Sequence, residues 1–218
     1  MTYSCGIFQD QSSSMKDASI EKLDRICRKL DIKPEDSVLE IGTGWGSFAL
    51  HAAGNYGCHV TTTTISDAQY NYARQKIEAA GLTDRITLLK EDYRKLTGQY
   101  DKVVSIEMIE AVGHEYVPLY FQKVSSLLKD DGLFGIQGIT YNDQNFDVYK
   151  QSVDFIKKYI FPGSCLISVA QVMEAMKNYT DLSISHLEDI TLHYATTLKI
   201  WRTNFLKEIN AVKKLGFS

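Results

Sequence analysis

Three glycines at alternate positions, Gly42, Gly44 and Gly46, follow directly after the short apolar run at residues 38–41. Such a run predicts a buried parallel strand, and glycines placed after it let the backbone turn sharply and approach a ligand closely. In α/β proteins this arrangement builds a nucleotide-binding crevice at the carboxyl end of the first strand. The chemistry to expect here is the binding of a nucleoside.

The spacing of the glycines indicates which kind of nucleoside. Loops that bind a pyrophosphate prefer G-x-G-x-x-G, followed about 20 residues later by an acidic residue. Here the spacing is G-x-G-x-G, and residues 61–64 in the corresponding place are four threonines. The pattern argues against NAD and favours a nucleoside without a pyrophosphate, of which S-adenosylmethionine is the commonest. For a glycine loop taken alone, a purely structural turn is the alternative interpretation.

Composition excludes several functional classes. The 218 residues predict one α/β domain with ample material for a core. A net charge of −3 gives no global field that would attract nucleic acid. No apolar run approaches the roughly 20 residues that cross a membrane, and the first residues do not resemble a signal peptide. The four cysteines are widely spaced and no two histidines have metal-ligand spacing, so we expect free thiols, a cytoplasmic location and no metal site.

Hydrophobic periodicity and turn signals predict alternating strands and helices. We expect strands at 37–41, 58–64, 86–89, 102–106 and 133–139, and helices at 15–30, 47–56, 66–80 and 116–129. This alternation predicts an α/β fold with a doubly wound, mostly parallel sheet. The single domain 1–218 is expected to carry a helical insertion of two helices at 142–180, then a sixth strand at 183–193 and a final helix at 196–214.

Seven short motifs along the chain resemble one family. They are Y-S-C at 3–5, V-L-E-I-G-T-G-W-G at 38–46, T-I-S-D-A-Q at 64–69, E-D-Y-R at 91–94, S-I-E-M-I-E at 105–110, Y-I-F-P-G at 159–163 and H-Y-A-T-T-L at 193–198. Together they resemble the cyclopropane fatty-acid and mycolic-acid synthases, S-adenosylmethionine-dependent enzymes that methylate the double bonds of acyl chains. Plant benzylisoquinoline N-methyltransferases share much of the pattern. The resemblance therefore implies a Rossmann-like class I methyltransferase fold and indicates the cofactor more firmly than the acceptor.

The resemblance also implies which residues bind the cofactor. They are Tyr3, Ser4, Glu40, Gly42, Thr43, Gly44, Gly46, Thr64, Ile65, Gln69, Asp92 and Tyr93. Glu40 would orient the loop amides or meet the cofactor's ammonium, and Gln69 would bind the ribose in place of an acid. Ordinary structural alternatives exist for three of them. Glu40 could cap the loop, Gln69 could complete a helix capping box, and Asp92 could be an exposed acid in a turn.

A reaction at an alkene has particular requirements. Methyl transfer leaves a carbocation, and ring closure needs the loss of a proton, so the site must be dry and must hold a base. The resemblance implies that the base is bicarbonate, held by Cys5, Glu110, Tyr194 and the backbone of Ile139. Gln137 stands where the family often has histidine, and its amide can donate a hydrogen bond but does not titrate near neutrality. The structural alternatives are an exposed helix-start carboxylate for Glu110, a half-buried strand tyrosine for Tyr194 and a small buried residue for Cys5.

Two departures from the family bear on activity. Family members usually continue beyond this C-terminus with a seventh strand, and they usually carry helices before the Y-S-C motif. We expect a fragment, a shortened homologue that dimerises, or a degenerate member that binds cofactor without turnover. The implied partners are the acyl chains of unsaturated phospholipids at the inner membrane face, reached through Lys150, Lys157 and Lys158, and a second copy bound through the region after Tyr194. The alternative functions are N-methylation of a small amine and silent cofactor binding.

Overall fold

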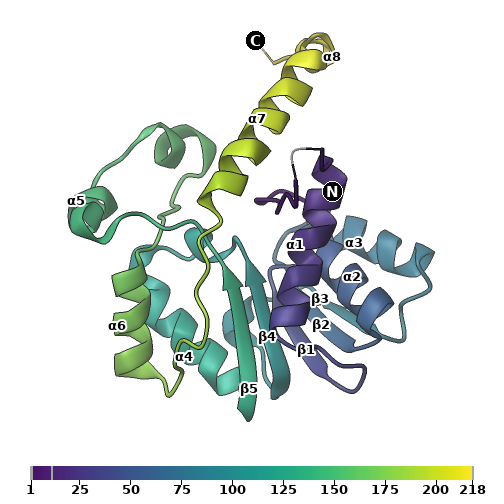
Figure 1. Cartoon of the computed structure of the whole chain (residues 1–218), viewed down its shortest axis with the longest axis vertical. Helices are drawn as coiled ribbons and strands as arrows, with labels where there is room; N and C mark the ends of the chain where they lie inside the picture. The colour runs from purple at the N-terminus through teal and green to yellow at the C-terminus, as the bar shows by residue number, and fades with distance from the viewer. Residues whose placement is uncertain (1, 11, 218) are drawn as a thin grey trace.

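Five parallel strands form one sheet in the order β3-β2-β1-β4-β5 in the computed structural model, which describes residues 2–10 and 12–217 (Figure 1). The strands are β1 (Ser37–Ile41), β2 (His59–Thr63), β3 (Ile86–Leu89), β4 (Tyr100–Ile106) and β5 (Leu128–Gln137). The five strands expected from the sequence are confirmed. The chain runs outward from β1 to β3 and then returns to the other side of β1 at β4. Such a reversal opens a crevice at the carboxyl ends of the two central strands.

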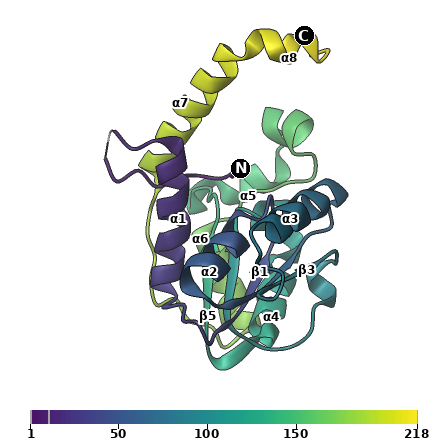
Figure 2. The same cartoon turned by 90° about the vertical axis from the view of Figure 1, so that its right-hand side faces the viewer.

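Helices cover both faces of the sheet, because successive side chains of a strand point to opposite faces (Figures 1 and 2). One face lies under α1 (Met15–Lys29), α2 (Ser47–Tyr56) and α3 (Asp67–Ala79), and its core includes Leu23, Val38, Phe48 and Ile77. The other face lies under α4 (Val117–Leu127) and α6 (Val169–Tyr179), and its core includes Leu39, Val103, Tyr120 and Met176. This is the doubly wound architecture expected from the sequence.

The insertion after β5 is mostly short helical turns. It contains the 3-10 turn Asp143–Asn145, α5 (Phe146–Gln151) and a single π-helical turn (Ile156–Ile160), before α6 begins at residue 169. The third core cluster, formed by Phe146, Tyr149 and Cys165, lies here. The α6 helix packs against α4 through Ala175 and Met176, so the last part of the expected insertion completes the cover of the sheet.

The prediction of a sixth strand at 183–193 is wrong. Residues 181–190 contain no strand, and α7 (Thr191–Lys207) begins inside the predicted segment. Alternating apolar residues do not make a strand without a neighbour to pair with, and Ile184 and Leu187 remain exposed here. Asp189 accepts the Thr191 N–H at 2.8 Å and so favours the start of a helix. The expected final helix also divides, because α8 (Ile209–Lys214) follows α7 as a separate helix.

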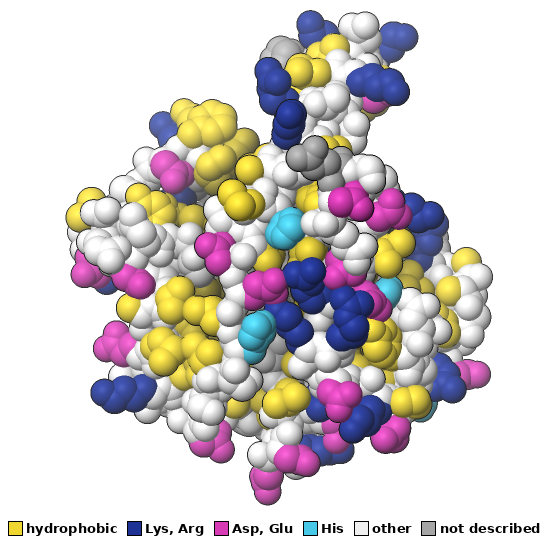
Figure 3. All heavy atoms as spheres, viewed as in Figure 1, with side chains coloured by type: hydrophobic (Ala, Val, Ile, Leu, Met, Phe, Trp, Pro, Cys, Tyr) yellow, Lys and Arg dark blue, Asp and Glu magenta, His cyan; other side chains and the backbone are white. Residues whose placement is uncertain are grey.

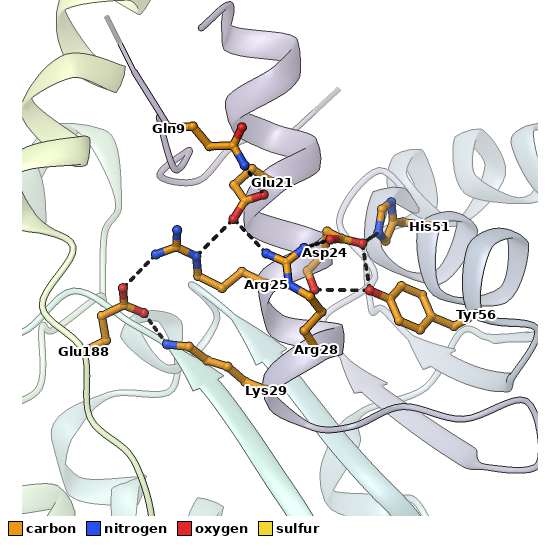
Figure 4. A network of polar contacts seen from close by, with 9 residues as sticks. All are labelled: Gln9, Glu21, Asp24, Arg25, Arg28, Lys29, His51, Tyr56 and Glu188. Carbon is orange, nitrogen blue, oxygen red and sulfur yellow. Dashed lines mark hydrogen bonds and ion pairs between the residues drawn. The ribbon is translucent and has the colours of Figure 1, made fainter.

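A network of polar contacts ties the segment before α7 to α1 (Figure 4). Glu188 accepts from Arg25 Nη1 at 2.7 Å and pairs with Lys29. On the other side of α1, Asp24 accepts from the Tyr56 hydroxyl at 2.7 Å, which joins α1 to α2. The network therefore holds the segment before α7 against α1. Beyond it, α7 and α8 rise above the carboxyl edge of the sheet (Figure 2).

The N-terminal segment runs between α7 and the sheet. Thr197 on α7 is fully buried and accepts the Gly6 N–H at 3.1 Å, while His193 Nδ1 accepts the Phe8 N–H at 3.2 Å. Ile7 donates its backbone N–H to the carbonyl of Ala18 in α1 at 2.9 Å. Residues from both ends of the chain are thereby brought to the carboxyl edge of the sheet.

Candidate functional site

The loop after β1 has left-handed backbone at each of its three glycines, with φ +99° at Gly42, +51° at Gly44 and +84° at Gly46. A Cβ atom on Gly42 would lie 3.0 Å from the Met108 side chain, and one on Gly46 would lie 3.2 Å from Ala73 Cβ. At Gly44 a Cβ atom would meet nothing within 4 Å. The outer glycines are therefore needed for packing, whereas Gly44 presents bare backbone to open space. A ligand can approach that backbone closely.

Beneath the loop lies a buried carboxyl group. Glu40 is 3% exposed, and its Oε2 accepts from the Thr62 hydroxyl at 2.6 Å. The Thr62 hydroxyl lies 2.7 Å from that of Thr43 in the loop. Burial raises the pKa of Glu40 to about 8, although the Thr62 hydrogen bond and the charge of Lys22 act in the opposite direction. Glu40 thus supports the loop through two hydroxyl groups, and a cation bound above it would favour its charged form.

The start of α3 combines a helix cap with an amide that can bind a ligand. Ser66 Oγ accepts the Gln69 N–H at 3.3 Å, so the predicted cap at Ser66 is present. The Gln69 side chain does not complete a capping box; its Oε1 accepts instead from the Thr64 hydroxyl at 2.8 Å. Among the described residues the Gln69 amide nitrogen has no hydrogen-bond partner. An amide NH₂ held in this way can donate to a ribose hydroxyl.

A cavity of about 390 Å³ lies at the carboxyl ends of β2 and β3. It is lined by Ile65, Leu89, Lys90, Glu91, Asp92 and Lys95. Three residues expected near the cofactor therefore meet here or close by: Ile65 and Asp92 line the cavity, and Tyr93 follows Asp92. The Asp92 carboxylate accepts from Arg94 Nη2 at 2.6 Å and Nε at 2.9 Å, and these contacts hold its pKa below the usual range. Asp92 thus also has the structural role of a cap on a 3-10 turn.

The N-terminal segment closes over the other end of the crevice. Tyr3 is exposed and stacks on Trp201 of α7, with ring centroids 5.3 Å apart. Ser4 and Cys5 are buried, and the Cys5 N–H donates to Glu107 Oε1 at 2.8 Å. Burial raises the pKa of the Cys5 thiol to about 11, so this group stays protonated and is a poor nucleophile.

Glu107, a residue not predicted from the sequence as part of the site, links the N-terminal segment to the sheet. Its Oε1 also accepts from Gln137 Nε2 at 2.8 Å, and its own backbone N–H donates to the Gln137 carbonyl at 2.7 Å. Glu107 has φ +46°, an unusual backbone conformation for a residue with a side chain, at the point where β4 ends. The available signal was its place directly after a predicted strand, at the edge where the crevice lies. The amide of Gln137 is thus engaged by Glu107.

Glu110 lies three residues after Glu107 in the sequence and has a different environment. Its Oε1 accepts the Ile139 N–H at 2.6 Å, so the expected backbone contact of Ile139 goes to Glu110 itself. Its Oε2 is buried and has no hydrogen-bond partner among the described residues. Burial raises the pKa of Glu110, partly offset by the hydrogen bond from Ile139. An orphaned carboxyl oxygen in a dry place is suited to exchanging a proton or to holding a small polar group.

Tyr194 completes the cluster from α7. Its side chain is half-buried and packs edge-on to Trp201, with ring centroids 6.5 Å apart. Burial, together with the charges of Glu107, Cys5 and Glu110, raises its pKa, so its hydroxyl is a proton donor at neutral pH. The residues present fit both implied groups. Bare backbone at Gly44, a buried carboxyl group and the amide of Gln69 suit S-adenosylmethionine. The Tyr194 hydroxyl can donate to bicarbonate, as can Glu110 in its protonated form, which burial favours.

Other kinds of site receive no support in the described part of the chain. In residues 2–10 and 12–217 no group of His, Cys, Asp and Glu could hold a metal ion. The same residues contain no helix that is long and apolar enough to cross a membrane. The four cysteines are free and buried.

Comparison with known proteins connects this geometry to a family. The model of the family described as mycolic acid cyclopropane synthetase matches residues 1–218, the whole chain. The tuberculostearic acid methyltransferase of Mycobacterium tuberculosis is 38% identical over 224 residues, which are 100% of this chain and 52% of that protein. The cyclopropane-fatty-acyl-phospholipid synthase of Escherichia coli K12 is 38% identical over 208 residues, 94% of this chain and 51% of that protein.

A solved structure agrees with the fold. The mycolic acid cyclopropane synthase complexed with SAH and CTAB matches with a TM-score of 0.86 and 26% identity, over 95% of this chain and 75% of that one. The chain spans about half the length of the curated relatives it matches.

Proposed function

Because the chain belongs to the mycolic acid cyclopropane synthetase family, we propose that it binds S-adenosylmethionine and methylates the double bond of an unsaturated fatty-acyl chain in a phospholipid. The product would be a cyclopropane or a methyl-branched chain. Its relatives include both a cyclopropane synthase and a tuberculostearic acid methyltransferase, and both act on lipids by name. We expect the protein to act at the inner face of the membrane.

The observation that carries this proposal is the buried, unpartnered Oε2 of Glu110 at the same sheet edge as the bare backbone of Gly44. The cofactor would supply an electrophilic methyl group on a sulfonium. An alkene has no proton to lose before it attacks, so a proton acceptor is needed only after methyl transfer. A dry carboxyl group with a free oxygen can hold the ion that accepts this proton, which the solvated acids of a surface site do less well.

The residues of this chain would have distinct tasks in such a reaction. The loop after β1, with Glu40 and Gln69, would bind and orient the cofactor. Glu110 and Tyr194 would hold the bicarbonate that the resemblance implies, and bicarbonate would supply the base. The aromatic rings of Tyr194 and Trp201 would exclude water and tolerate the positive charge that develops on the acyl chain.

An exposed apolar patch supports contact with a lipid surface. Val148, Val153, Phe155 and Tyr159 in the insertion are each 62–75% exposed. Figure 3 shows apolar side chains gathered over this part of the molecule, at the upper left of the view. The Lys158 ammonium lies 5.1 Å from the ring of Tyr159, so a cation adjoins the patch. Exposed aromatic and aliphatic groups beside lysines are typical of surfaces that dock on anionic lipid.

A single assay tests the function. The chain would be incubated with S-adenosylmethionine carrying a trideuterated methyl group and, in separate samples, vesicles of an unsaturated phospholipid or a panel of small amines. Mass spectrometry would then follow the label. A cyclopropane retains two deuterium atoms because one is lost on ring closure, whereas a methyl branch that keeps the transferred group intact retains three.

The control variants make the result specific to the site. Glu110→Gln should lose lipid labelling, whereas Glu115→Gln, which changes an exposed acid on the next turn, should keep it. Labelled amines without labelled lipid would support the N-methyltransferase alternative instead. Cofactor binding without any labelled product would support a silent binding protein.

A further inference from the structure

A second cavity, of about 260 Å³, lies where the insertion after β5 meets residues 113–114. Its lining includes His114, Lys150 and Lys157, together with Ser152 and Ser164. None of the described residues that line it is an aspartate or a glutamate. In a protein with a net charge of −3, a cavity lined by two lysines and no acid is suited to binding an anion.

Lys157 holds a positive charge at this cavity without an acidic partner. Its ammonium donates to the backbone carbonyls of Tyr149 at 2.7 Å and Ser152 at 3.0 Å, and lies 3.7 Å from the centroid of the Tyr149 ring. Among the residues that the structure describes it forms no ion pair, and Asp154 instead accepts the Lys157 backbone N–H. The carbonyls and the ring fix the ammonium in place but carry no net negative charge. One of its three N–H groups remains for an anion.

Lys150 brings a second ammonium to the same cavity. It pairs with Asp147 at 2.6 Å, and the Asp147 side chain is 88% exposed. Ion pairs at such exposure contribute little, so an anion in the cavity can compete with Asp147 for this ammonium. The imidazole of His114 and the serine hydroxyls are further hydrogen-bond donors. Several donors and two cations around one cavity match the oxygens of a phosphate group.

The exposed apolar patch of the insertion adjoins the cavity. Val153 belongs to both, because it lines the cavity and is 73% exposed. Phe155 follows in the same segment, and Figure 3 shows apolar side chains gathered over this part of the molecule. A segment that docks on a bilayer buries its apolar groups at the boundary between headgroups and acyl chains. Lipid phosphates lie beside that boundary, so a cavity next to the patch is placed to meet them.

The backbone connects the cavity to the candidate site. Cys165, which also lines the cavity, donates its backbone N–H to the carbonyl of Glu110 at 2.9 Å. His114 lies four residues after Glu110 in the sequence. A headgroup held in the cavity would therefore lie beside the segment that carries the candidate acid.

We propose that this cavity binds the phosphate group of an anionic phospholipid headgroup when the insertion docks on a membrane. The inference rests on the proposed function, because it takes the substrate to be a lipid in a bilayer. Lys150 and Lys157 would donate to the phosphate oxygens while the apolar patch enters the bilayer. The phosphate would supply the negative charge that Lys157 lacks. A soluble phosphate ester has the same chemistry but gains nothing from the patch, so a lipid is the ligand that uses both features.

Vesicle binding by variants of neighbouring lysines tests the cavity. The vesicles would consist of digalactosyldiacylglycerol, a bilayer lipid without phosphate. They would carry either phosphatidylglycerol or enough oleate to give the same surface potential. Cosedimentation would compare the parent with Lys150→Met, Lys157→Met and Lys158→Met. Lys158 is exposed in the same turn and does not line the cavity, so its replacement removes the same charge from the same segment.

The parent should bind the phosphatidylglycerol vesicles at least about tenfold more tightly than the oleate vesicles, because the charge-assisted hydrogen bonds of the cavity form with phosphate. Lys150→Met and Lys157→Met should lose most of this preference. Lys158→Met should weaken binding to both vesicles by about fivefold, the effect of one charge near a bilayer, and should keep the preference. A parent without a preference would overturn the proposal. An equal loss of preference in Lys158→Met would overturn it as well.

Further measurements keep the result specific. If Lys157→Met does not fold, Lys150→Met decides, because the one ion pair of Lys150 in the described chain is with the exposed Asp147. Calorimetry with inorganic phosphate separates the two sources of phosphate, since binding as tight as to the vesicles would assign the cavity to a soluble ligand and contradict the membrane assignment. Vesicle binding needs no S-adenosylmethionine. The expected preference without labelled lipid would therefore refute the proposed function alone, and labelled lipid without the preference would refute the cavity alone.

Discussion

Replacing Gly44 with alanine tests whether a ligand approaches the backbone of the loop after β1. Gly44 has φ +51° and open space where a Cβ atom would be. The substitution therefore introduces backbone strain and one methyl group, but no clash within the protein. Gly81 provides a matched control, because it has φ +65° and also has nothing within 4 Å of an added Cβ atom. It lies just after α3, away from the loop.

The backbone strain and the added methyl group determine the expected changes in stability and in affinity. A left-handed backbone costs a non-glycine residue about 1–2 kcal/mol, and both variants should lose this much stability. For a domain of this size that corresponds to a fall of roughly 2–8 °C in Tm. A methyl group inserted into a close contact costs about 1–3 kcal/mol, and only Gly44→Ala should add it to ligand binding. The dissociation constant should then rise by roughly 5- to 150-fold.

Two measurements separate stability from binding. Thermal unfolding would compare Gly44→Ala with Gly81→Ala, and calorimetry with S-adenosylhomocysteine would compare their affinities. We expect similar Tm values and a weaker affinity for Gly44→Ala alone. If Gly44→Ala binds as tightly as Gly81→Ala, no ligand approaches the backbone at this glycine and the crevice has been placed wrongly.

The remaining predictions concern charge and association. Glu110→Gln keeps an acceptor for the Ile139 N–H, so the affinity for S-adenosylhomocysteine should stay within about twofold. Labelling of the lipid should fall roughly 100-fold or more. An equal loss of affinity would make Glu110 a cofactor ligand. The pKa of Glu40 lies near 8 in the folded state, above its ordinary 4.5, so the folded protein holds a proton that the unfolded chain releases. From pH 4.5 to 8 the parent should lose roughly 2–4 kcal/mol relative to Glu40→Gln in urea unfolding, and parallel pH profiles would contradict this. Glu188→Gln should speed hydrogen exchange in residues 181–190 and lower Tm by no more than about 4 °C, since ion pairs at this exposure contribute little; unchanged exchange would show that the pair does not hold the segment. The exposed apolar groups of α7 and α8, such as Phe205 and Leu215, predict a homodimer, and sedimentation should find a compact monomer for Phe205→Glu but not for the parent.

The part of the fold that could be predicted is the part determined by local sequence. The central strands β1 and β4 each combine a short apolar run with a turn signal, and both are buried between helices whose own periodicity is clear. The segment at 183–193 alternates in the same way, but alternation says nothing about whether a neighbouring strand is available. Here Glu188 contacts α1, and Asp189 favours a helix start. Both are specific side-chain interactions, and the hydrophobic periodicity of the sequence does not report them.

The residues of the candidate site that could be predicted are likewise those that lie in local sequence motifs. The glycine loop, Gln69 and Glu110 lie in motifs and could be named from the sequence. Glu107 lies in the same motif as Glu110, but its role depends on a left-handed backbone at the end of β4 and on a contact with the N-terminal segment. Lys22 follows the usual pattern of a lysine on an amphipathic helix, which indicates a solvated side chain. Its burial results from the packing of Ser4 over it, 18 residues away in the sequence.

The three acids at the carboxyl edge of the sheet are not equivalent, and the difference bears on the chemistry. Glu40 and Glu107 accept hydrogen bonds that hold the glycine loop and the N-terminal segment in place. Glu110 uses one oxygen to position Ile139 and leaves the other buried without a partner among the described residues. A proton can therefore arrive at Glu110 Oε2 and leave again without breaking a hydrogen bond within the protein. Glu110 is therefore the acid of the three that combines a fixed position with a buried oxygen available to a bound group.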